Sequence, residues 1–190
     1  DLLLSVAGTS DSVRLWSFFY GDGQGGAPYG LSEVRFADGT VWTGDQIRQQ
    51  MLVATPDADE LVGSTGDDLV EGRAGNDTLS GDAGDDTLDG GADNDFLAGG
   101  AGSDVYLFAR GFGQDVVSNW DGASESIDAI QFGAGIAVAD VRVYQSGSDL
   151  EIDLVGTNDV LRVYGYFADW DPTHAQRVEE IRFADGTVWD

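Results

Sequence analysis

The hydrophobic and polar residues between positions 54 and 107 repeat with a period of nine. An aspartate occupies the sixth place and a bulky residue the eighth place of six consecutive units. The eighth-place residues are Leu61, Val70, Leu79, Leu88, Leu97 and Tyr106. Glycine holds the first place in five units and the fourth place in four of them. A fixed short period of this kind predicts stacked coils in which each unit contributes the same element.

Each unit divides into a turn and a short strand. The first six places are rich in Gly and Asp, which favour tight turns with positive φ angles. Places seven to nine can form a strand whose eighth side chain alone points into a core. Two units of nine then make one coil of eighteen residues. Such a coil stacks the sixth-place aspartates in the pairs 59/77, 68/86, 77/95 and 86/104.

The stacked aspartates require a counter-charge. Between residues 57 and 104, twelve Asp and two Glu accompany a single base, Arg73. Coulomb repulsion would push such a column of carboxylates apart. Hard oxygen ligands with no Cys or His in the tract indicate calcium. The alternative is an acidic, disordered tract, but disorder does not explain an apolar residue at every eighth place.

These units resemble the GGxGxDxUx nonapeptides of RTX proteins, the haemolysin-type calcium-binding repeats. Units 63–71, 72–80, 81–89 and 99–107 keep Gly at the first and fourth places and Asp at the sixth. In unit 90–98 Asp93 replaces the fourth-place glycine, and unit 54–62 has no glycine. We expect those two turns to bind calcium weakly or to end the coil. The resemblance implies an all-β fold: a calcium-bound parallel β-roll (a right-handed β-solenoid) capped by β-rich flanking segments.

The resemblance also implies the calcium ligands. These are the sixth-place carboxylates and backbone carbonyls from the first four places of each turn, which together would hold about four or more ions. The predicted ligands are Asp59, Gly63, Thr65, Gly66, Asp68, Gly72, Ala74, Gly75, Asp77, Gly81, Ala83, Gly84, Asp86, Gly90, Ala92, Asp93, Asp95, Gly99, Ala101, Gly102 and Asp104.

The flanking segments read as short strands and hairpins. Alternating apolar residues predict strands over 127–132, 141–145, 150–155, 160–167 and 178–183. Asp-Gly turn signals predict hairpins over 31–42 and 178–189, and Asp45 is placed to cap a short helix to Leu52. We therefore divide the chain into residues 1–53, a partial copy of the flanking β module; residues 54–107, the β-roll; and residues 108–190, a C-terminal β-rich capping module.

The two flanks repeat one another. Residues 1–19 align without gaps to residues 149–167, and the sequence RFADGTVW occurs at 35–42 and again at 182–189. This order predicts a window from a longer tandem array. It is similar to bacterial proteins in which RTX blocks alternate with a haemolysin-type calcium-binding-related domain. Stacked coils need caps at both ends, and the two copies could supply them.

Composition excludes several classes of function. The net charge of −26 argues against nucleic acid or an anionic membrane surface as a partner. No apolar run approaches the roughly 20 residues that a membrane span needs. The chain has no Cys, so it has no disulfide framework. His174 is the only histidine, which excludes zinc sites and catalytic triads built on paired histidines. We therefore expect no enzymatic activity.

The favoured function is a calcium-binding, calcium-folded module of a larger bacterial secreted protein. The resemblance implies type I secretion, with folding outside the cell or at its surface and with neighbouring modules of the parent protein as partners. No signal segment precedes Asp1, which we take as the mark of a fragment. Two alternatives stay open: a segment of a secreted adhesin that binds carbohydrate or protein through aromatic groups such as Trp16, Tyr164 and Trp170, and an accessory domain of a secreted hydrolase or toxin.

Overall fold

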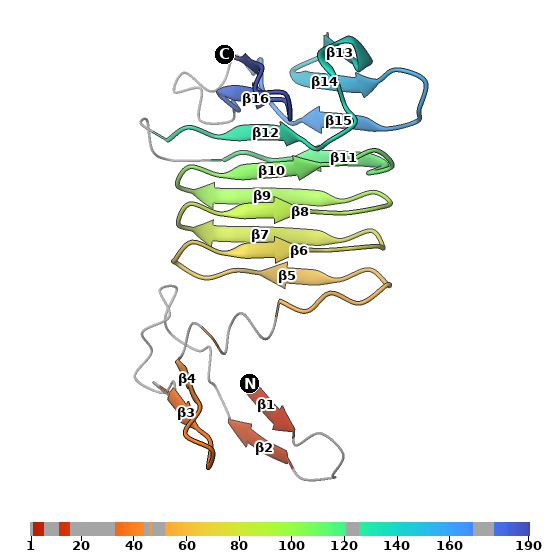
Figure 1. Ribbon diagram of the computed structural model, residues 1–190. Coiled ribbons are helices and arrows are strands. Elements are labelled where there is room, and N and C mark those ends of the chain that lie inside the picture. The colour runs from red at the N-terminus through yellow and green to blue at the C-terminus, as the bar shows by residue number, and fades with distance from the viewer. Residues whose placement is uncertain are drawn as a thin grey trace. The chain divides into compact units, whose positions relative to one another are not determined.

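The computed structural model describes residues 2–5, 12–15, 33–43, 46, 52–120, 126–168 and 177–190. The chain forms two compact units, Asp1–Gln50 and Met51–Asp190. Figure 1 traces the strands of each unit. Among the described residues, no helix has the length and apolar character needed to cross a membrane. The fold is all-β, as the sequence predicts, with one 3-10 helix, η1 (Val138–Asp140), in the second unit.

The second unit is built from two sheets of mainly parallel strands (Figure 1). One sheet has the order β13 (Val141–Ser146), β14 (Asp149–Leu154), β15 (Val160–Val163), β11 (Gln114–Val117), β9 (Phe96–Ala101), β7 (Thr78–Ala83) and β5 (Glu60–Val62). The other has the order β17 (Val188–Trp189), β16 (Glu180–Arg182), β12 (Ala129–Phe132), β10 (Val105–Phe108), β8 (Thr87–Asp89) and β6 (Leu69–Glu71). From β5 to β12 the chain alternates between the sheets, which is the arrangement of a parallel β-roll.

The register of the strands confirms the eighteen-residue coil. Leu61 is paired with Leu79, Val70 with Leu88, and Leu79 with Leu97. These eighth-place side chains are buried and form one core cluster with Tyr106. Seventh-place residues point the other way; Leu69, for example, is 49% exposed. Since a strand alternates its faces, the nine-residue period delivers one core residue per strand. Burial of each such leucine contributes about 1.5–3 kcal/mol.

The parallel stacking crosses the predicted end of the repeats at Leu107. β11 pairs in parallel with β9 and β15, and β12 pairs in parallel with β10 and β16. The strands predicted over 141–145, 150–155 and 160–167 appear as an antiparallel meander of β13, β14 and β15, of which β15 ends at Val163. Its last strand, β15, extends the sheet by pairing in parallel with β11. Residues 141–145, which the sequence predicts as a strand, belong to β13, an edge strand with four consecutive exposed residues.

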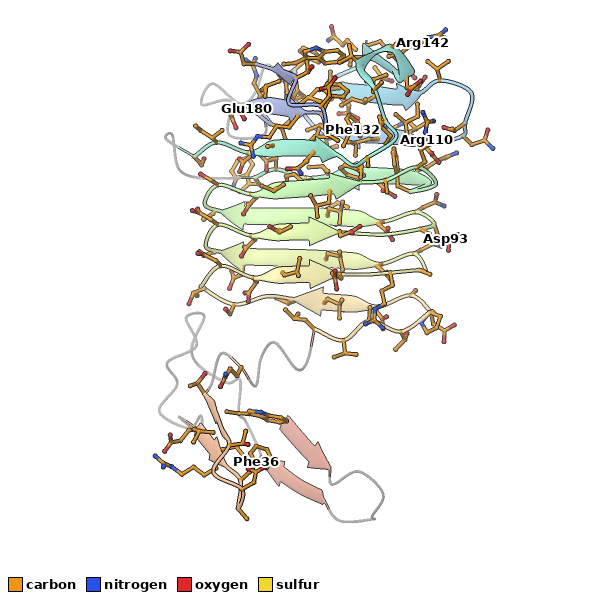
Figure 2. All side chains as sticks on the ribbon, viewed as in Figure 1. Phe36, Asp93, Arg110, Phe132, Arg142 and Glu180 are labelled. Atoms are coloured by element: carbon orange, nitrogen blue, oxygen red, sulfur yellow. The ribbon has the colours of Figure 1, made fainter. Side chains whose placement is uncertain are left out.

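Aromatic residues fill the core where the coils meet the last strands. Phe108 contacts Phe112 at a ring-centroid distance of 5.0 Å and Phe132 at 6.4 Å. Phe183 lies 5.6 Å from Phe132 and 4.9 Å from Trp189. Figure 2 shows Phe132 among the side chains at this end of the unit. Larger side chains suit this region because the coils no longer repeat with a uniform period.

The first unit contains two antiparallel hairpins, β1 (Leu2–Ser5) with β2 (Ser12–Leu15) and β3 (Glu33–Arg35) with β4 (Val41–Thr43). The hairpin predicted over 31–42 is thus confirmed for its described part. Of the helix predicted from Asp45 to Leu52, only positions 46 and 52 lie among the described residues.

The core column of the roll generates the first prediction. Replacing Leu88, which is fully buried, with Ala should lower the free energy of unfolding of the folded form by roughly 2–5 kcal/mol, because a cavity forms in a stack that cannot collapse along its axis. Leu69→Ala, on the exposed face of neighbouring β6, should cost less than about 1 kcal/mol. Urea unfolding measures the free energy of unfolding of both variants. Equal losses would contradict the assignment of Leu88 to the core and of Leu69 to the exposed face.

Candidate metal centre

The sixth-place aspartates form two columns along the roll. From Asp77 to Asp104, Oδ1 of each accepts a hydrogen bond from the backbone N–H of the sixth-place aspartate eighteen positions earlier, at 2.8–2.9 Å. The resulting pairs are 59/77, 68/86, 77/95 and 86/104. The predicted stacking of these pairs is therefore confirmed, while their service as metal ligands stays a prediction.

Both columns continue past the repeats that the sequence analysis recognised. Asp95 N–H donates to Asp115 Oδ1 at 2.9 Å, and Asp104 N–H donates to Asp128 Oδ1 at 2.7 Å. We call Asp59, Asp77, Asp95 and Asp115 the first acid ladder, and Asp68, Asp86, Asp104 and Asp128 the second acid ladder. The sequence analysis missed Asp115 and Asp128 because their spacings of 20 and 24 residues break the period.

A local signal could have identified the missed residues. In every coil the ladder acid stands two positions before a core residue, as Asp115 stands before Val117 and Asp128 before Ile130. The same spacing recurs in the last strands, at Asp159 with Leu161 and at Glu179 with Ile181. Glu179 Oε2 accepts a bond from Asp128 N–H at 2.8 Å, and Asp159 Oδ2 accepts one from Gly111 N–H at 2.8 Å. Carboxylates thus reach the strands that follow both ladders.

The second carboxylate oxygen of these ladders is buried. Asp77, Asp86, Asp95 and Asp115 are 1–3% exposed, and the Oδ2 atom of each has no hydrogen-bond partner among the described residues. A buried, charged oxygen without a partner costs several kcal/mol. These atoms therefore need either a proton or a cation.

The first-place glycines let oxygen atoms of successive coils converge. A Cβ placed on Gly72 would lie 2.5 Å from Asp77 Oδ2 and 2.6 Å from the carbonyl oxygen of Gly90. A Cβ on Gly63 would meet Asp68 Oδ2 at 2.8 Å and the Gly81 carbonyl oxygen at 2.5 Å. A side chain at either place would fill this cradle. One carboxylate and one carbonyl oxygen thus approach the same point from different coils, a donor set that suits calcium.

The turn geometry is kept even where glycine is absent. The fourth-place residue Gly75 has a φ of 114°, and Asp93, at the same place in its own unit, has a φ of 82°. The second-place residues Arg73 and Asp82 have φ angles of 74° and 78°. Figure 2 shows Asp93 in the turns along one side of the roll. The structure therefore gives unit 90–98 the same left-handed fourth place as its neighbours.

The remaining predicted ligands lie in the same turns. Third-place residues of alternate units are paired, Ala74 with Ala92 and Ala83 with Ala101. The Ala101 carbonyl accepts a bond from Gly84 N–H at 2.8 Å, and a carbonyl oxygen retains a second lone pair. In the described residues no three Asp, Glu, His or Cys side chains group closely enough to hold a metal ion by themselves. Any ion in these turns would therefore rely on backbone carbonyls as well as aspartates.

Burial disfavours the charged form of the ladder carboxyls. Desolvation, followed by repulsion from Asp68 for Asp86 and from Asp77 for Asp95, raises the pKa of Asp86 and of Asp95 to about 6. Burial, with repulsion from Asp95, raises the pKa of Asp115 to about 8. Burial also raises the pKa of Asp77. A fully ionised ladder is therefore unfavourable without a counter-charge.

The second ladder ends at a neutral side chain. Tyr106, which replaces the eighth-place leucine, donates its hydroxyl proton to Asn119 Oδ1 at 2.6 Å and accepts a bond from Gly99 N–H at 2.9 Å. Asn119 Nδ2 donates to Asp128 Oδ2 at 2.7 Å and to the carbonyl oxygen of Arg177 at 2.7 Å. The sequence analysis missed Asn119, because nothing in the local sequence places it beside Asp128. An amide donor thus faces the last aspartate of this ladder.

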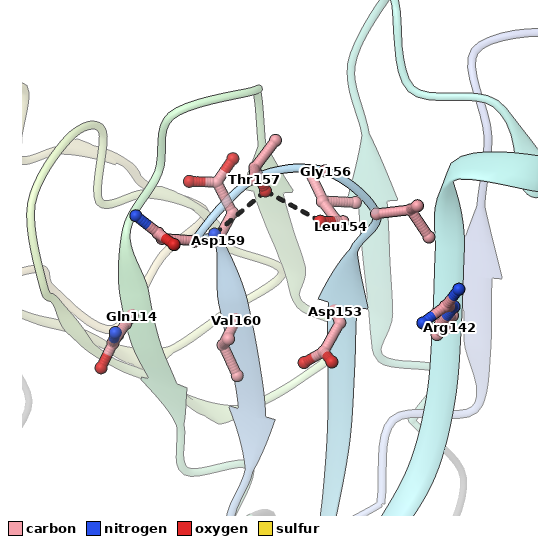
Figure 3. Close-up of a pocket in the computed structure, with 10 residues that line it drawn as sticks. Gln114, Arg142, Asp153, Leu154, Gly156, Thr157, Asp159 and Val160 are labelled. Atoms are coloured by element: carbon pink, nitrogen blue, oxygen red, sulfur yellow. Dashed lines mark hydrogen bonds between the residues drawn. The ribbon is translucent and has the colours of Figure 1, made fainter.

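A pocket of about 340 Å³ lies beside the turn between β14 and β15 (Figure 3). The Thr157 hydroxyl donates to the Leu154 carbonyl at 2.9 Å and accepts a bond from Asp159 N–H at 3.0 Å. Both of these hydrogen bonds of the Thr157 hydroxyl are made within the turn itself. Arg142 and Asp153 also line the pocket.

The aromatic groups separate into buried and exposed members. Tyr166, in the turn that follows β15, packs against the core, and the Arg177 guanidinium lies 5.5 Å from its ring. Tyr164 and Trp120, in contrast, are more than half exposed. Trp16 and Trp170 lie outside the described residues.

Two families match the chain. The haemolysin-type calcium binding protein related domain matches residues 1–46 and 149–190, which contain the repeated hairpins. The RTX calcium-binding nonapeptide repeat (4 copies) matches residues 53–88, 71–106 and 80–117, which contain the coils and reach beyond Asp115. The sequence-based resemblance to both is confirmed.

Individual relatives share only parts of the chain. The iron-regulated protein FrpA of Neisseria meningitidis serogroup C is 42% identical over 85 residues, which are 45% of this chain and 8% of that protein. The solution structure of the AlgE6R3 subunit from the Azotobacter vinelandii mannuronan C5-epimerase is 28% identical and covers 70% of this chain and 82% of its own, with a TM-score of 0.45. The extracellular lipase LipA of Serratia marcescens is 26% identical, covers 60% of this chain and 20% of its own, and has a TM-score of 0.34.

The glycine cradle generates a second prediction. Gly72→Ala should destabilise the folded roll by roughly 1–3 kcal/mol, because its Cβ would push Asp77 and the Gly90 carbonyl apart. Gly66→Ala is the matched control, since no atom lies within 4 Å of the corresponding Cβ. Calcium titration followed by urea unfolding compares the two. A Gly66 variant as damaged as the Gly72 variant would contradict the proposed cradle.

The raised pKa values predict how the metal-free form depends on pH. A carboxyl whose pKa rises from 3.8 to about 6 on folding adds stability that is complete below 3.8 and lost as the pH passes 6. For Asp115 this loss extends to about pH 8. In chelator, β structure should therefore be more stable at pH 5 than at pH 8, as measured by circular dichroism with urea.

The double variant Asp86→Asn with Asp95→Asn separates this effect from the overall negative charge. Two ladder side chains in it cannot ionise, so the stability difference between pH 5 and pH 8 should shrink. A metal-free wild-type roll that becomes more stable from pH 5 to pH 8 would refute the explanation.

Proposed function

We propose that this chain, which carries RTX calcium-binding nonapeptide repeats between segments of the haemolysin-type calcium binding protein related domain, is a calcium-folded structural module of a larger secreted protein. The observation that carries the proposal is the set of buried Oδ2 atoms without partners on Asp77, Asp86, Asp95 and Asp115. Folding takes these carboxylates out of water, and calcium can supply the positive charge that neutralises them there.

The proposed ligands are the aspartates of both acid ladders except Asp128, whose Oδ2 accepts the Asn119 amide, together with turn carbonyls such as that of Gly90. About four or more ions would lie between coils, with Asp115 adding a position beyond the repeats first recognised. Bound calcium would neutralise the carboxylates and hold the turns of successive coils together. We assign no catalytic role to these repeats, because equivalent metal-bound carboxylates do not provide the separate acid and base that catalysis requires.

The proposed location is outside the cell or at its surface. Extracellular modules bind calcium at roughly 10⁻⁴–10⁻³ M, so a site of this class stays empty in the cytosol and fills outside. The extracellular lipase among the similar structures supports this location. Type I secretion fits a chain that stays unfolded until it meets calcium, with neighbouring modules of the parent protein as its other contacts.

An accessory role beside a catalytic domain is the second candidate. It is favoured by the similarity to a subunit of an epimerase and to part of a lipase. A carbohydrate- or protein-binding role has weaker support, because Tyr164 and Trp120 are exposed but line neither the pocket beside the β14–β15 turn nor the pocket beside Phe108 in the described part of the chain. The same calcium-dependent fold would underlie either role.

Calcium removal tests the proposal. In chelator at pH 8 the far-ultraviolet circular dichroism of the second unit should lose most of its β signal. Roughly millimolar calcium should restore the signal cooperatively. A chelated protein with an unchanged spectrum and intact protection from hydrogen exchange would refute calcium-dependent folding.

Two ladder variants locate the ions. Asp86→Asn should raise the calcium midpoint by about tenfold or more, since a lost charge-assisted contact costs about 1.5–3 kcal/mol. Asp59→Asn is the control, because Asp59 stands at the ladder's end and its Oδ2 already accepts bonds from Thr55 at 2.6 Å and 3.0 Å. Equal shifts in both variants would argue against ions between the coils.

A further inference from the structure

The hairpins of the first unit reproduce those at the end of the second in conformation as well as in sequence. Val34 is paired with Trp42 and Ile181 with Trp189, the same register shifted by 147 positions. The Phe36–Trp42 rings lie 4.8 Å apart at 68°, and the Phe183–Trp189 rings lie 4.9 Å apart at 67°. Leu2 is paired with Leu15 as Leu150 is with Val163. β2 therefore corresponds to β15, and β3 corresponds to β16.

In the second copy, the remaining edges of these hairpins pair with strands of the roll. β15 pairs with β14 on one edge and docks in parallel on β11 with the other. Val160 N–H donates to the Gly113 carbonyl at 2.8 Å, and Tyr164 N–H to the Val117 carbonyl at 2.9 Å. β16 pairs with β17 and docks in parallel on β12. The C-terminal hairpins thus close the last coil of a roll.

The corresponding edges of β2 and β3 pair with no strand that the structure describes in the first unit. Among its described residues, β2 pairs with β1 and β3 with β4, in separate two-stranded sheets. The apolar face differs in the same way. Phe183 is 4% exposed because it packs against Phe132 of β12, whereas Phe36, in an otherwise matching hairpin, is 41% exposed. Figure 2 labels both Phe36 and Phe132. Phe36 thus lacks the cover that a roll gives its counterpart.

We propose that β2 and β3 form a docking surface for the last coil of another nonapeptide-repeat β-roll. β2 would pair with a strand equivalent to β11, and β3 with a strand equivalent to β12, while the counterpart of Phe132 would cover Phe36. The partner is a roll that precedes this unit in the parent protein. The N-terminal unit would then be the cap of one roll as the C-terminal strands are the cap of the next.

The roll of this chain is not the occupant that the geometry favours. Its last coil is already paired with β15 and β16. Its first strands, β5 and β6, present the opposite edge of each sheet, since their inner edges pair with β7 and β8. The hairpins of the first unit correspond to strands that dock on the last coil of a roll. They therefore do not match the free edges of β5 and β6 at the first coil.

A joined chain tests the proposal. Residues 51–148 are placed before residue 1 of the full chain, so that the first copy follows an added roll as residue 149 follows residue 148. With saturating calcium, the amides of Ser12, Arg14 and Glu33 should exchange at least about tenfold more slowly than in the original chain. The amides of Val160, Arg162 and Glu180 in the same molecule provide the reference for a docked copy.

A proline variant shows whether the pairing is the proposed one. Since Val160 N–H and Tyr164 N–H both face β11, the alternating Arg162 N–H faces it too, and Arg14 N–H is its equivalent. Arg14→Pro removes that donor from the docking edge. It should abolish the added protection at Ser12 and Glu33 and unfold the added roll's last coil, while the downstream roll keeps its calcium response.

Each other outcome has a defined meaning. Unchanged exchange at Ser12 and Glu33 in the joined chain, with the downstream roll still folding on calcium, overturns the docking proposal and leaves the proposed function intact. Protection in the original chain that grows with protein concentration assigns the surface to a second copy of the chain, which overturns the chosen partner. If the original chain does not fold in response to calcium, the result contradicts the proposed function and not the docking proposal.

Discussion

The structure depends on one electrostatic constraint: aspartate carboxylates are stacked coil upon coil in places that exclude water. From Asp77 onward, Oδ1 of each ladder aspartate accepts a backbone N–H, while burial leaves Oδ2 of Asp77, Asp86, Asp95 and Asp115 without a partner among the described residues. The backbone bonds fix the position of the charge but do not neutralise it, so the pKa of Asp86 and of Asp95 rises. Burial of the apolar column stabilises the coil, but the same folding also takes these charges out of water. A cation relieves that conflict.

The ladders also explain why the roll and its C-terminal strands form a continuous structure. Asp115 and Asp128 extend the ladders into β11 and β12, and Glu179 then binds the N–H of Asp128. At this junction Asn119 provides an amide donor to Asp128. The protein itself thus satisfies the last aspartate of the second ladder, whereas Oδ2 of Asp115, the last aspartate of the first ladder, has no partner among the described residues. Aromatic residues such as Phe132 enlarge the core over the same coils.

Repetition operates at two scales in this chain. Nine residues build a strand with its turn, and the longer repeat builds a pair of hairpins that can close a stack. A stacked fold whose units contact only their neighbours grows by adding units and ends only where a different unit blocks the last edge. The two copies of the hairpins share backbone pairing but differ in burial, as Phe36 and Phe183 show. The local sequence thus sets the shape of a hairpin, and its surroundings decide whether it is covered.

The sequence by itself determined the coil, the core column and the stacked aspartate pairs. Because the period is strict, the same place in every unit has the same position in the coil. Leu79 could therefore be assigned to the core, and Asp86 to a stacked pair, without knowledge of distant contacts. The tertiary structure decided where the stack continues, because loops of unequal length bring Asp115 and Asp128 into ladders that the period does not reach. It also placed Asn119 beside Asp128 and made β13 an edge strand. These contacts join segments far apart in the chain, and packing across a sheet, not local propensity, selects them.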